Sequence, residues 1–254
     1  MLDLDRMTAR AYRFGKHPPQ QDYRTLRLKD YFTPALAPPP ASYNVLTEAY
    51  KQLGLSDPAV LFPMDGNDAY GDCTVAAMAH AVTTYCGLVG TRNIMANQDV
   101  VKLYLQLTGG LDSGLNELKV LNYWQSQPVS GDKILAFAKI DMKNHTHIQQ
   151  AIQLFGGVYL GFQVQQNCQE QFFARQPWTP GPLTQHGHAV YAVAYDSTGV
   201  TVLTWGNTQN ATWAWWDECV DEAYAILPPQ AEQPGFAPGF DFTQLRSDLK
   251  AVAG

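Results

Sequence analysis

The sequence predicts an α+β protein in which a helical half precedes an antiparallel β half. Between about residues 66 and 155, apolar residues recur at three- and four-residue spacing, which is typical of amphipathic helices. Between about residues 156 and 228, short runs of β-branched and aromatic residues follow one another, which is typical of strands. With 254 residues, of which 46% are hydrophobic and 16% charged, the chain can bury a substantial core.

The first 58 residues predict an extended arm. They are rich in proline and basic residues and include the polyproline-like stretch "LAPPPAS". Apolar anchors in "RTLRLKDYF" favour an arm docked across the body over a disordered tail. The predicted folded domain then spans 59–228, and 229–254 forms a linker that ends in a short amphipathic helix.

The helical half is expected to begin with a helix capped by Asp72 and ended by Gly87. Helices around 97–109 and 115–124 follow, and a fourth over 146–157 has Thr146 as its predicted cap. The expected strands are "VYLGFQV", "HAVYAVAYD", "GVTVLTWG", "ATWAWW" and "EAYAILP". A hairpin is predicted at "DSTG".

Charge and hydropathy exclude several classes of function. The formal net charge is −6 and there is no Lys/Arg cluster, so a nucleic-acid partner is not expected. No run of eighteen apolar residues and no signal peptide is visible, so we expect no membrane association and a location in the cytoplasm or in a delivered assembly. No cofactor is expected. The four cysteines are interpreted as free thiols, namely Cys73, Cys86, Cys168 and Cys219.

Cys73 is the first candidate for chemistry. It follows the turn-forming run "DGNDAYGD" and falls in the first turn of the predicted helix. Unpaired backbone N–H groups and the positive end of the dipole bias a cysteine there toward the nucleophilic thiolate. Position alone favours a small apolar residue that starts a core helix, and a distant histidine is needed to support a nucleophile.

His188 is the candidate general base, because it opens the strand "HAVYAVAYD" and is expected at an accessible rim. His186, two residues earlier, shares the same face of an early-starting strand, so a His186–His188 metal pair is a competing interpretation. No third ligand with metal-site spacing accompanies the pair, and we therefore predict no metal site.

Together these motifs resemble the papain-like cysteine peptidase family. The resemblance is carried by "GNDAYGDC" entering an Ala-rich helix and by "GHAVYAVAYDSTGVTVLTWG", and it extends to bacterial and phage-type relatives of this fold. It implies a helical lobe, whose long central helix starts at Cys73, packed on an antiparallel β-barrel-like lobe. It also implies a nucleophilic Cys73, a basic His188 and an N-terminal segment lying across the cleft.

The resemblance implies roles for a few further residues. In that family the side-chain amide of the oxyanion hole stands six residues before the nucleophile, and this chain has Asn67 there. The alternative is that Asn67 is only a turn residue. Trp205, Gly187 and Asp72 are expected to line the substrate-binding part of the site.

The residue that orients the histidine is where the sequence departs from the family. Leu203 stands where the family has Asn, and Thr204 is expected on the opposite face of the strand unless a bulge turns it. Asn207, Gln209 and Asn210 lie just beyond, in reach from the loop.

Two functions therefore remain open. The first is a thiol hydrolase with a Cys73–His188 dyad that cleaves an amide bond of a peptide or protein substrate. The second is a catalytically inactive papain-like scaffold that enters a protein assembly through the N-terminal arm.

Overall fold

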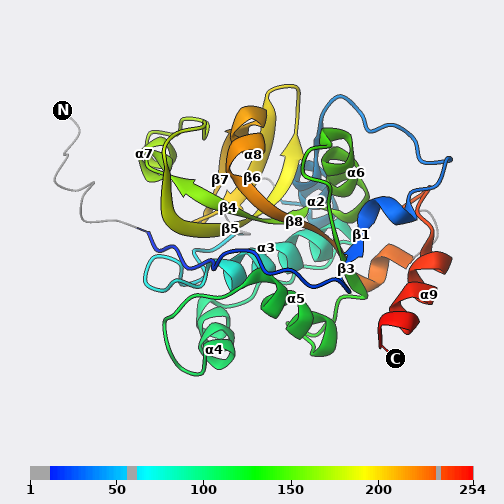
Figure 1. The fold of residues 1–254 in the computed structure, drawn as a ribbon, viewed down its shortest axis with the longest axis horizontal. Helices are drawn as coiled ribbons and strands as arrows, with labels where there is room; N and C mark the ends of the chain where they lie inside the picture. Colours follow the sequence, from blue (N-terminus) through cyan, green and yellow to red (C-terminus); the bar gives the residue numbers. More distant parts are fainter. Residues whose placement is uncertain (1–11, 56–61, 233–235, 254) are drawn as a thin grey trace.

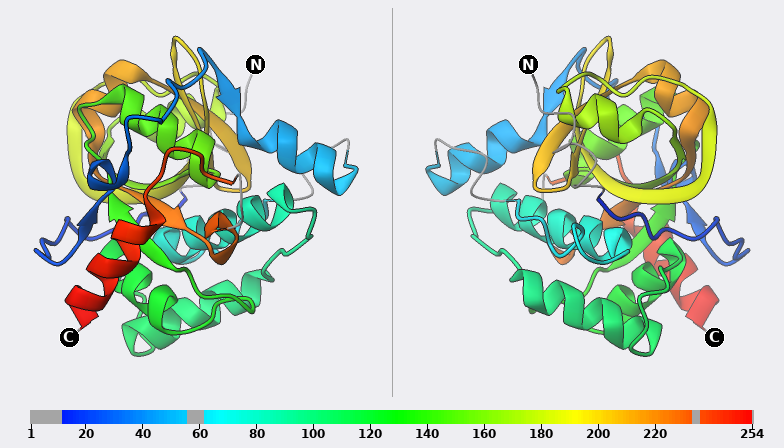
Figure 2. Two further views of the ribbon diagram at one scale, coloured as in Figure 1. Left: turned by 90° about the vertical axis from the view of Figure 1, so that its right-hand side faces the viewer. Right: turned by 90° about the vertical axis from the view of Figure 1, so that its left-hand side faces the viewer.

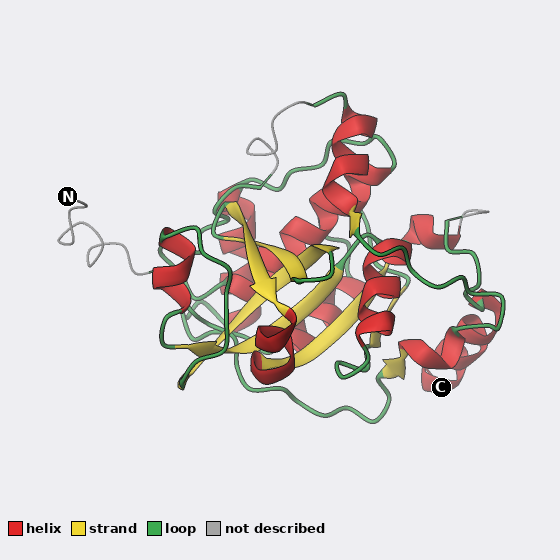
Figure 3. Ribbon diagram, turned by 90° about the horizontal axis from the view of Figure 1, so that it is seen from above, coloured by secondary structure: helices red, strands yellow, loops and turns green. Residues whose placement is uncertain are grey.

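The computed structural model describes residues 12–55, 62–232 and 236–253. It has the predicted α+β architecture, with helices on both sides of one mixed sheet (Figure 1). Helices α3, α4 and α5 lie below the sheet in Figure 1, and α6, α7 and α8 lie above it. Viewed from above, the strands gather in the middle of the molecule with the helices around them (Figure 3).

The sheet has eight strands in the order β1-β3-β8-β4-β5-β6-β7, and β2 pairs with β5 off this path. It is open, whereas the sequence predicted a barrel-like lobe. Only β1 runs parallel to its neighbour. The strands are β1 Leu26–Arg27, β2 Tyr43–Asn44, β3 Ala136–Lys139, β4 Val158–Gln165, β5 Leu183–Tyr195, β6 Gly199–Thr204, β7 Asn207–Thr212 and β8 Val220–Leu227.

The helices agree with most of the predicted periodicity. They are α2 Val45–Leu53, α3 Cys73–Leu88, α4 Asn97–Thr108, α5 Glu117–Ser126, α6 His145–Phe155, α7 Cys168–Phe173, α8 Trp213–Cys219 and α9 Phe242–Ala253, with short 3-10 turns η1 Leu28–Tyr31 and η3 Pro229–Glu232. Every residue from Cys73 to Gly87 is buried, because α3 is apolar on all sides and lies at the centre of the molecule.

Three local predictions differ from the structure. Gly87 does not end α3; it lies inside the helix, where a Cβ would sit 3.1 Å from Ala49 of the crossing α2. Asn144, not Thr146, caps α6 by accepting a hydrogen bond from His147 N. The run "ATWAWW" begins in β7 and continues into α8 from Trp213, because Thr212 accepts a hydrogen bond from Trp215 N and caps the helix there.

The N-terminal arm lies against the body, as its apolar anchors indicate. Strand β1 pairs with β3, and β2 pairs with β5 (Figure 2). The arm is not extended throughout, because Asn44 caps α2 and the helix buries Val45, Leu46 and Ala49. The predicted boundary at residue 58 lies outside the described residues. None of the described helices is long and apolar enough to cross a membrane.

Candidate active site

Cys73 is the first residue of α3, as predicted, and only 1% of it is exposed. Burial raises the pKa of its thiol to about 12, although hydrogen bonds from the backbone N–H groups of Ala189 and Gly15 favour the thiolate. The expectation of a low-pKa thiol is therefore wrong for this state of the protein. The N-terminus of α3 favours the thiolate, but the loss of hydration on burial has the larger effect on the pKa of the thiol.

The cover over Cys73 is part of the chain itself. Residues 12–18, called here the crossing segment, run between α3 and α5 on one side and the sheet on the other (Figure 1). Lys16 N donates to Gly187 O at 3.1 Å, and His17 N donates to Leu115 O at 2.9 Å. The segment thus pairs with both halves of the protein, as an added strand would.

Gly15 makes the close approach at the thiol possible. A Cβ on this residue would overlap the backbone oxygen of Gly71, two residues before the cysteine. Leu115 N donates to Gly15 O at 2.9 Å, and this bond fixes the segment from the other side. Only a residue without a side chain allows the backbone to lie this close to the start of α3.

His188 lies within β5, opposite Phe162 of β4, and is fully buried. The predicted rim position is wrong, because β5 begins five residues earlier and the ring is covered. The Trp205 ring stacks on the imidazole at 4.6 Å between centroids, and Phe14 of the crossing segment meets it edge-on at 5.5 Å. Burial, with a smaller contribution from His80, lowers the pKa of His188 to about 3. The imidazole is therefore neutral.

Thr204 is the partner of His188. Its Oγ1 lies 2.8 Å from His188 Nε2, and the other ring nitrogen, Nδ1, is buried with no hydrogen-bond partner among the residues that the structure describes. The β5–β6 pairing shifts register between Ala192 and Ala194, so simple alternation along β6 does not predict where Thr204 points. The hydroxyl fixes the ring orientation and leaves Nδ1 unpaired.

Asn67 is buried, and its amide faces the crossing segment. Asn67 Nδ2 donates to Tyr70 O at 3.1 Å and to Arg13 O at 3.3 Å. The second contact matters for chemistry, because the side chain binds a peptide carbonyl of a segment that also contacts the thiol. Asn67 O also accepts from Arg13 N at 3.1 Å.

Asp72 is the N-cap residue of α3, as predicted, but its side chain makes no capping hydrogen bond to the helix. Burial raises the pKa of Asp72 to about 8, with Asp65 and Asp112 adding to the effect against an opposing hydrogen bond from Asn67. This buried carboxyl is consequently held protonated at neutral pH.

The two histidines of the alternative metal site lie in different surroundings. His186 is exposed and stacks on Phe14 at 5.8 Å, whereas His188 is buried. Within the described part of the chain, no three His, Cys, Asp or Glu side chains are placed to hold a metal ion.

Comparison with known proteins identifies the architecture. No protein-family model matches the chain, and no curated protein matches its sequence. The solved cysteine protease and lectin-like domains of Cwp84, a surface layer associated protein of Clostridium difficile, match with a TM-score of 0.57 at 14% identity over 88% of this chain. The chain spans 57% of that structure's length.

Two further solved structures agree with the first. Procathepsin B S9 from Trypanosoma congolense matches with a TM-score of 0.55 at 13% identity, over 85% of this chain and 86% of that one. The Carica candamarcensis cysteine protease CMS1MS2, solved in complex with E-64, matches with a TM-score of 0.51 at 15% identity, over 74% of this chain and 98% of that one.

The chain has a papain-like fold. At these identities the likeness concerns the fold alone, and the chemistry depends on the residues present. The papain-like fold confirms the architecture predicted from the motifs around Cys73 and His188.

The sequence did not point to one prominent feature of this papain-like molecule. Lys16 of the crossing segment reaches buried carboxylates of Glu117 and Glu222 and the partly exposed Asp221. Glu117 is far in the chain from the adjacent pair Asp221 and Glu222, so no local pattern joins the three. A lone lysine in a basic arm is an ordinary surface residue.

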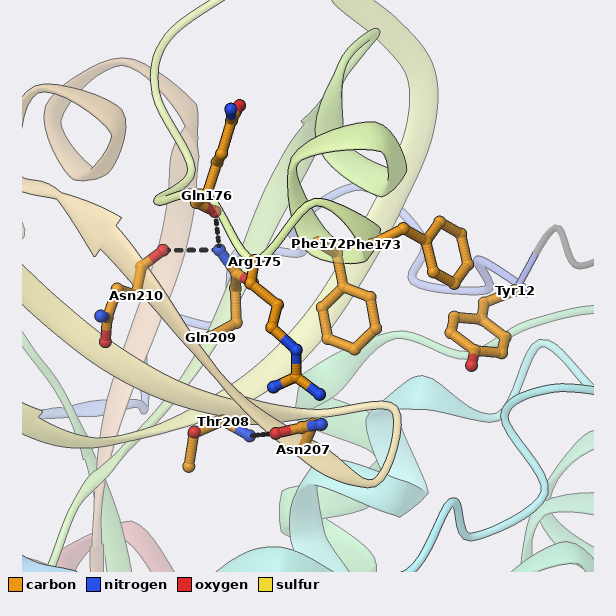
Figure 4. Close-up of a pocket in the computed structure, with 9 residues that line it drawn as sticks. All are labelled: Tyr12, Phe172, Phe173, Arg175, Gln176, Asn207, Thr208, Gln209 and Asn210. Atoms are coloured by element: carbon orange, nitrogen blue, oxygen red, sulfur yellow. Dashed lines mark hydrogen bonds between the residues drawn. The ribbon is translucent and has the colours of Figure 1, made fainter. Parts of the chain in front are cut away.

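A polar pocket lies at the other end of the crossing segment. Its volume is about 380 Å³, and Tyr12 forms part of its wall beside Phe172 and Phe173 (Figure 4). Figure 4 shows the Arg175 guanidinium extending between the Phe172 ring and the β6–β7 turn at Asn207. Asn207, Gln209 and Asn210, considered as partners of His188, line this pocket instead.

Proposed function

We propose that the protein is a thiol hydrolase that cleaves an amide bond of a peptide or protein. The observation that carries the proposal is the way in which the crossing segment is bound. An extended peptide contacts the thiol of Cys73 through Gly15 N–H, the Asn67 amide through Arg13 O and the Gly187 carbonyl through Lys16 N. A substrate peptide bound along the same surface would place a carbonyl at the Asn67 amide, as Arg13 O is placed, and an N–H at the Gly187 carbonyl.

In the proposed reaction the Cys73 sulfur attacks the substrate carbonyl carbon as a thiolate. His188 takes the thiol proton and returns it to the leaving amine, which gives a thioester. Water then hydrolyses the thioester with His188 as the base. Thr204 holds Nε2, so Nδ1 is the nitrogen left to exchange the proton.

The oxyanion that forms during attack needs donors. The Asn67 Nδ2 amide and the backbone N–H of Cys73 are the proposed pair. Asn67 Nδ2 already donates to a peptide carbonyl of the crossing segment, which supports this assignment. Trp205 packs on the imidazole and is proposed to shape the substrate cleft together with Gly187 and Asp72.

The covered state disfavours this chemistry. Burial raises the pKa of the Cys73 thiol to about 12 and lowers the pKa of the His188 imidazole to about 3, which favours the neutral forms of both groups over the reactive ion pair. Displacement of the crossing segment removes Phe14 from His188 and Gly15 from Cys73, and so reduces the burial that causes these shifts. Activity therefore requires that the segment leave the site.

The test is peptide cleavage by a chain whose crossing segment is displaced. The Gly15→Ala variant serves, because its new Cβ would overlap Gly71 O without altering a proposed catalytic group. Cleavage of a mixed peptide library by Gly15→Ala, lost in Gly15→Ala/Cys73→Ala and in Gly15→Ala/His188→Ala, is the expected result. Equal cleavage by all three variants would contradict the assignment.

The buried, neutral pair also favours a second candidate, an inactive scaffold in a protein assembly. In that case the crossing segment is a permanent part of the core. Displacing it then lowers the melting temperature and yields no cleavage, and Cys73 gains no reactivity toward iodoacetamide beyond that of an ordinary thiol.

A further inference from the structure

The side chain of Lys16 turns from the crossing segment into the protein interior. Only 1% of the side chain is exposed. The ammonium nitrogen lies 2.8 Å from Asp221 Oδ1 and 3.1 Å from Glu222 Oε1, and it also donates to His17 O at 3.3 Å. Lysine is rarely buried unless it is paired, so this is a built cation site occupied by the chain's own ammonium group.

The site gathers three carboxyl groups around one ammonium group. Burial raises the pKa of Glu117 and of Glu222, and the charge of Lys16 opposes this effect by favouring their ionised forms. Glu117, at the start of α5, is fully buried, and neither of its carboxylate oxygens has a hydrogen-bond partner among the described residues. Glu222 is also buried and accepts a hydrogen bond from Tyr224 OH at 3.0 Å. Attraction to these carboxylates outweighs burial and raises the pKa of Lys16.

The shape of the site fits a narrow alkyl stem. Gly161 of β4 forms one wall, and a Cβ there would overlap the Lys16 stem and lie 2.6 Å from Glu117 Oε1. The carboxylates come from α5 and β8 and the glycine from β4. These elements belong to the body, so the site remains when the crossing segment leaves.

We propose that this site, here called the carboxylate pocket and formed by Glu117, Gly161, Asp221 and Glu222, is a binding subsite for primary alkylammonium groups that selects a lysine side chain in the substrate. This specificity rests on the proposed hydrolase function, because Lys16 immediately follows Gly15, whose N–H contacts the thiol of Cys73. In the resting chain Lys16 occupies the pocket in place of the substrate lysine. Removing Lys16 leaves buried carboxylates without a cation. Binding of a basic side chain supplies that cation, and binding of an apolar side chain does not.

The first test asks whether the pocket binds an ammonium ion that is not covalently attached. Full-length Lys16→Ala is titrated with n-butylammonium, which reproduces the lysine side chain, and with n-butanol as the neutral control. We expect n-butylammonium to raise the melting temperature saturably in Lys16→Ala and to leave the wild type unchanged, because its pocket is filled. In Lys16→Ala/Glu222→Gln the apparent affinity should fall about tenfold or more, as for the loss of a charge-assisted hydrogen bond. Equal effects of the amine and the alcohol, or none from either, would overturn the proposal.

A second measurement covers the case in which Lys16→Ala does not fold. A synthetic peptide of residues 12–18 and its Lys→norleucine analogue are titrated into the Gly15→Ala chain, whose own segment is displaced. The lysine peptide should bind at least about tenfold more tightly, and Glu222→Gln in the same background should remove the preference. Equal binding of the two peptides would mean that Lys16 is only a structural ion pair.

These measurements test lysine binding in the carboxylate pocket separately from peptide cleavage. Binding needs no turnover, so the lysine preference should persist when Cys73→Ala is added to Gly15→Ala. A lysine preference without any peptide cleavage refutes the hydrolase and retains the cation site. Cleavage without a lysine preference refutes the subsite and retains the hydrolase.

Discussion

Replacing Gly15 by alanine should convert Cys73 from a protected thiol into a reactive one. The added Cβ would overlap the backbone oxygen of Gly71, which belongs to the turn that starts α3 and has little freedom to move. The crossing segment must therefore lift away from the thiol. The substitution leaves the side chains of Cys73 and His188 themselves unaltered.

The size of the effect follows from the bonds that hold the segment. Four backbone hydrogen bonds tie it to the body, namely Arg13 N to Asn67 O, Leu115 N to Gly15 O, Lys16 N to Gly187 O and His17 N to Leu115 O. At about 1 kcal/mol net for each, losing all four weakens docking by about 4 kcal/mol. Because 1.4 kcal/mol corresponds to a factor of ten, the open fraction and the labelling rate should rise by up to roughly three orders of magnitude.

The assay is the rate of iodoacetamide labelling at Cys73, read by peptide mass spectrometry. Gln20→Ala is the matched control, because Gln20 lies on the same arm with an exposed side chain. Cys86, buried inside α3, reports global unfolding in the same samples. Faster labelling of Cys73 alone is expected in Gly15→Ala. Unchanged labelling, or parallel labelling of Cys86, would refute the idea that the crossing segment is a separable cover.

Two further predictions concern residues around the thiol. Thr204→Val in the Gly15→Ala background should lower kcat/KM for peptide cleavage about fivefold to tenfold, because it removes one hydrogen bond to His188 Nε2. Thr204→Ser keeps a hydroxyl and should restore most of the lost kcat/KM. Equal losses in the Val and Ser variants would show that packing matters and the hydroxyl does not. Asp72→Asn should raise the melting temperature more at pH 8 than at pH 5. The folded-state pKa of about 8 lies above the unfolded value, so the stability due to the protonated Asp72 is fully present at low pH and is lost as pH rises toward 8. An equal shift at both pH values would contradict this account of Asp72.

Much of the fold could be predicted because local patterns and tertiary packing agree. The periodicity from Cys73 onward marks α3, and the β-branched runs mark β4, β5, β6 and β8. The run at 211–216 could not be assigned in this way. Its aromatic residues are typical of strands, but the Thr212 cap and tertiary burial of Trp215 and Trp216 favour a helix.

The candidate site was only partly visible in the sequence. Cys73, His188 and Asn67 could be proposed because the motifs around them are local. The structure brings all three to the crossing segment, and their catalytic roles stay predictions. The burial of the thiol and the imidazole could not be foreseen, because it depends on a distant segment that covers both. Thr204 was placed on the wrong face because the register shift in the β5–β6 pairing is a tertiary feature.

We infer that Cys73 and His188 form a reactive pair once the crossing segment is displaced. The most direct measurement is the pH dependence of Cys73 labelling by iodoacetamide in Gly15→Ala, compared with Gly15→Ala/His188→Ala. The account predicts labelling that stays fast below about pH 7 and slows when the histidine is removed, as for a thiolate held by an imidazolium. Labelling that follows an ordinary thiol titration near about pH 8.5 in both variants would contradict it.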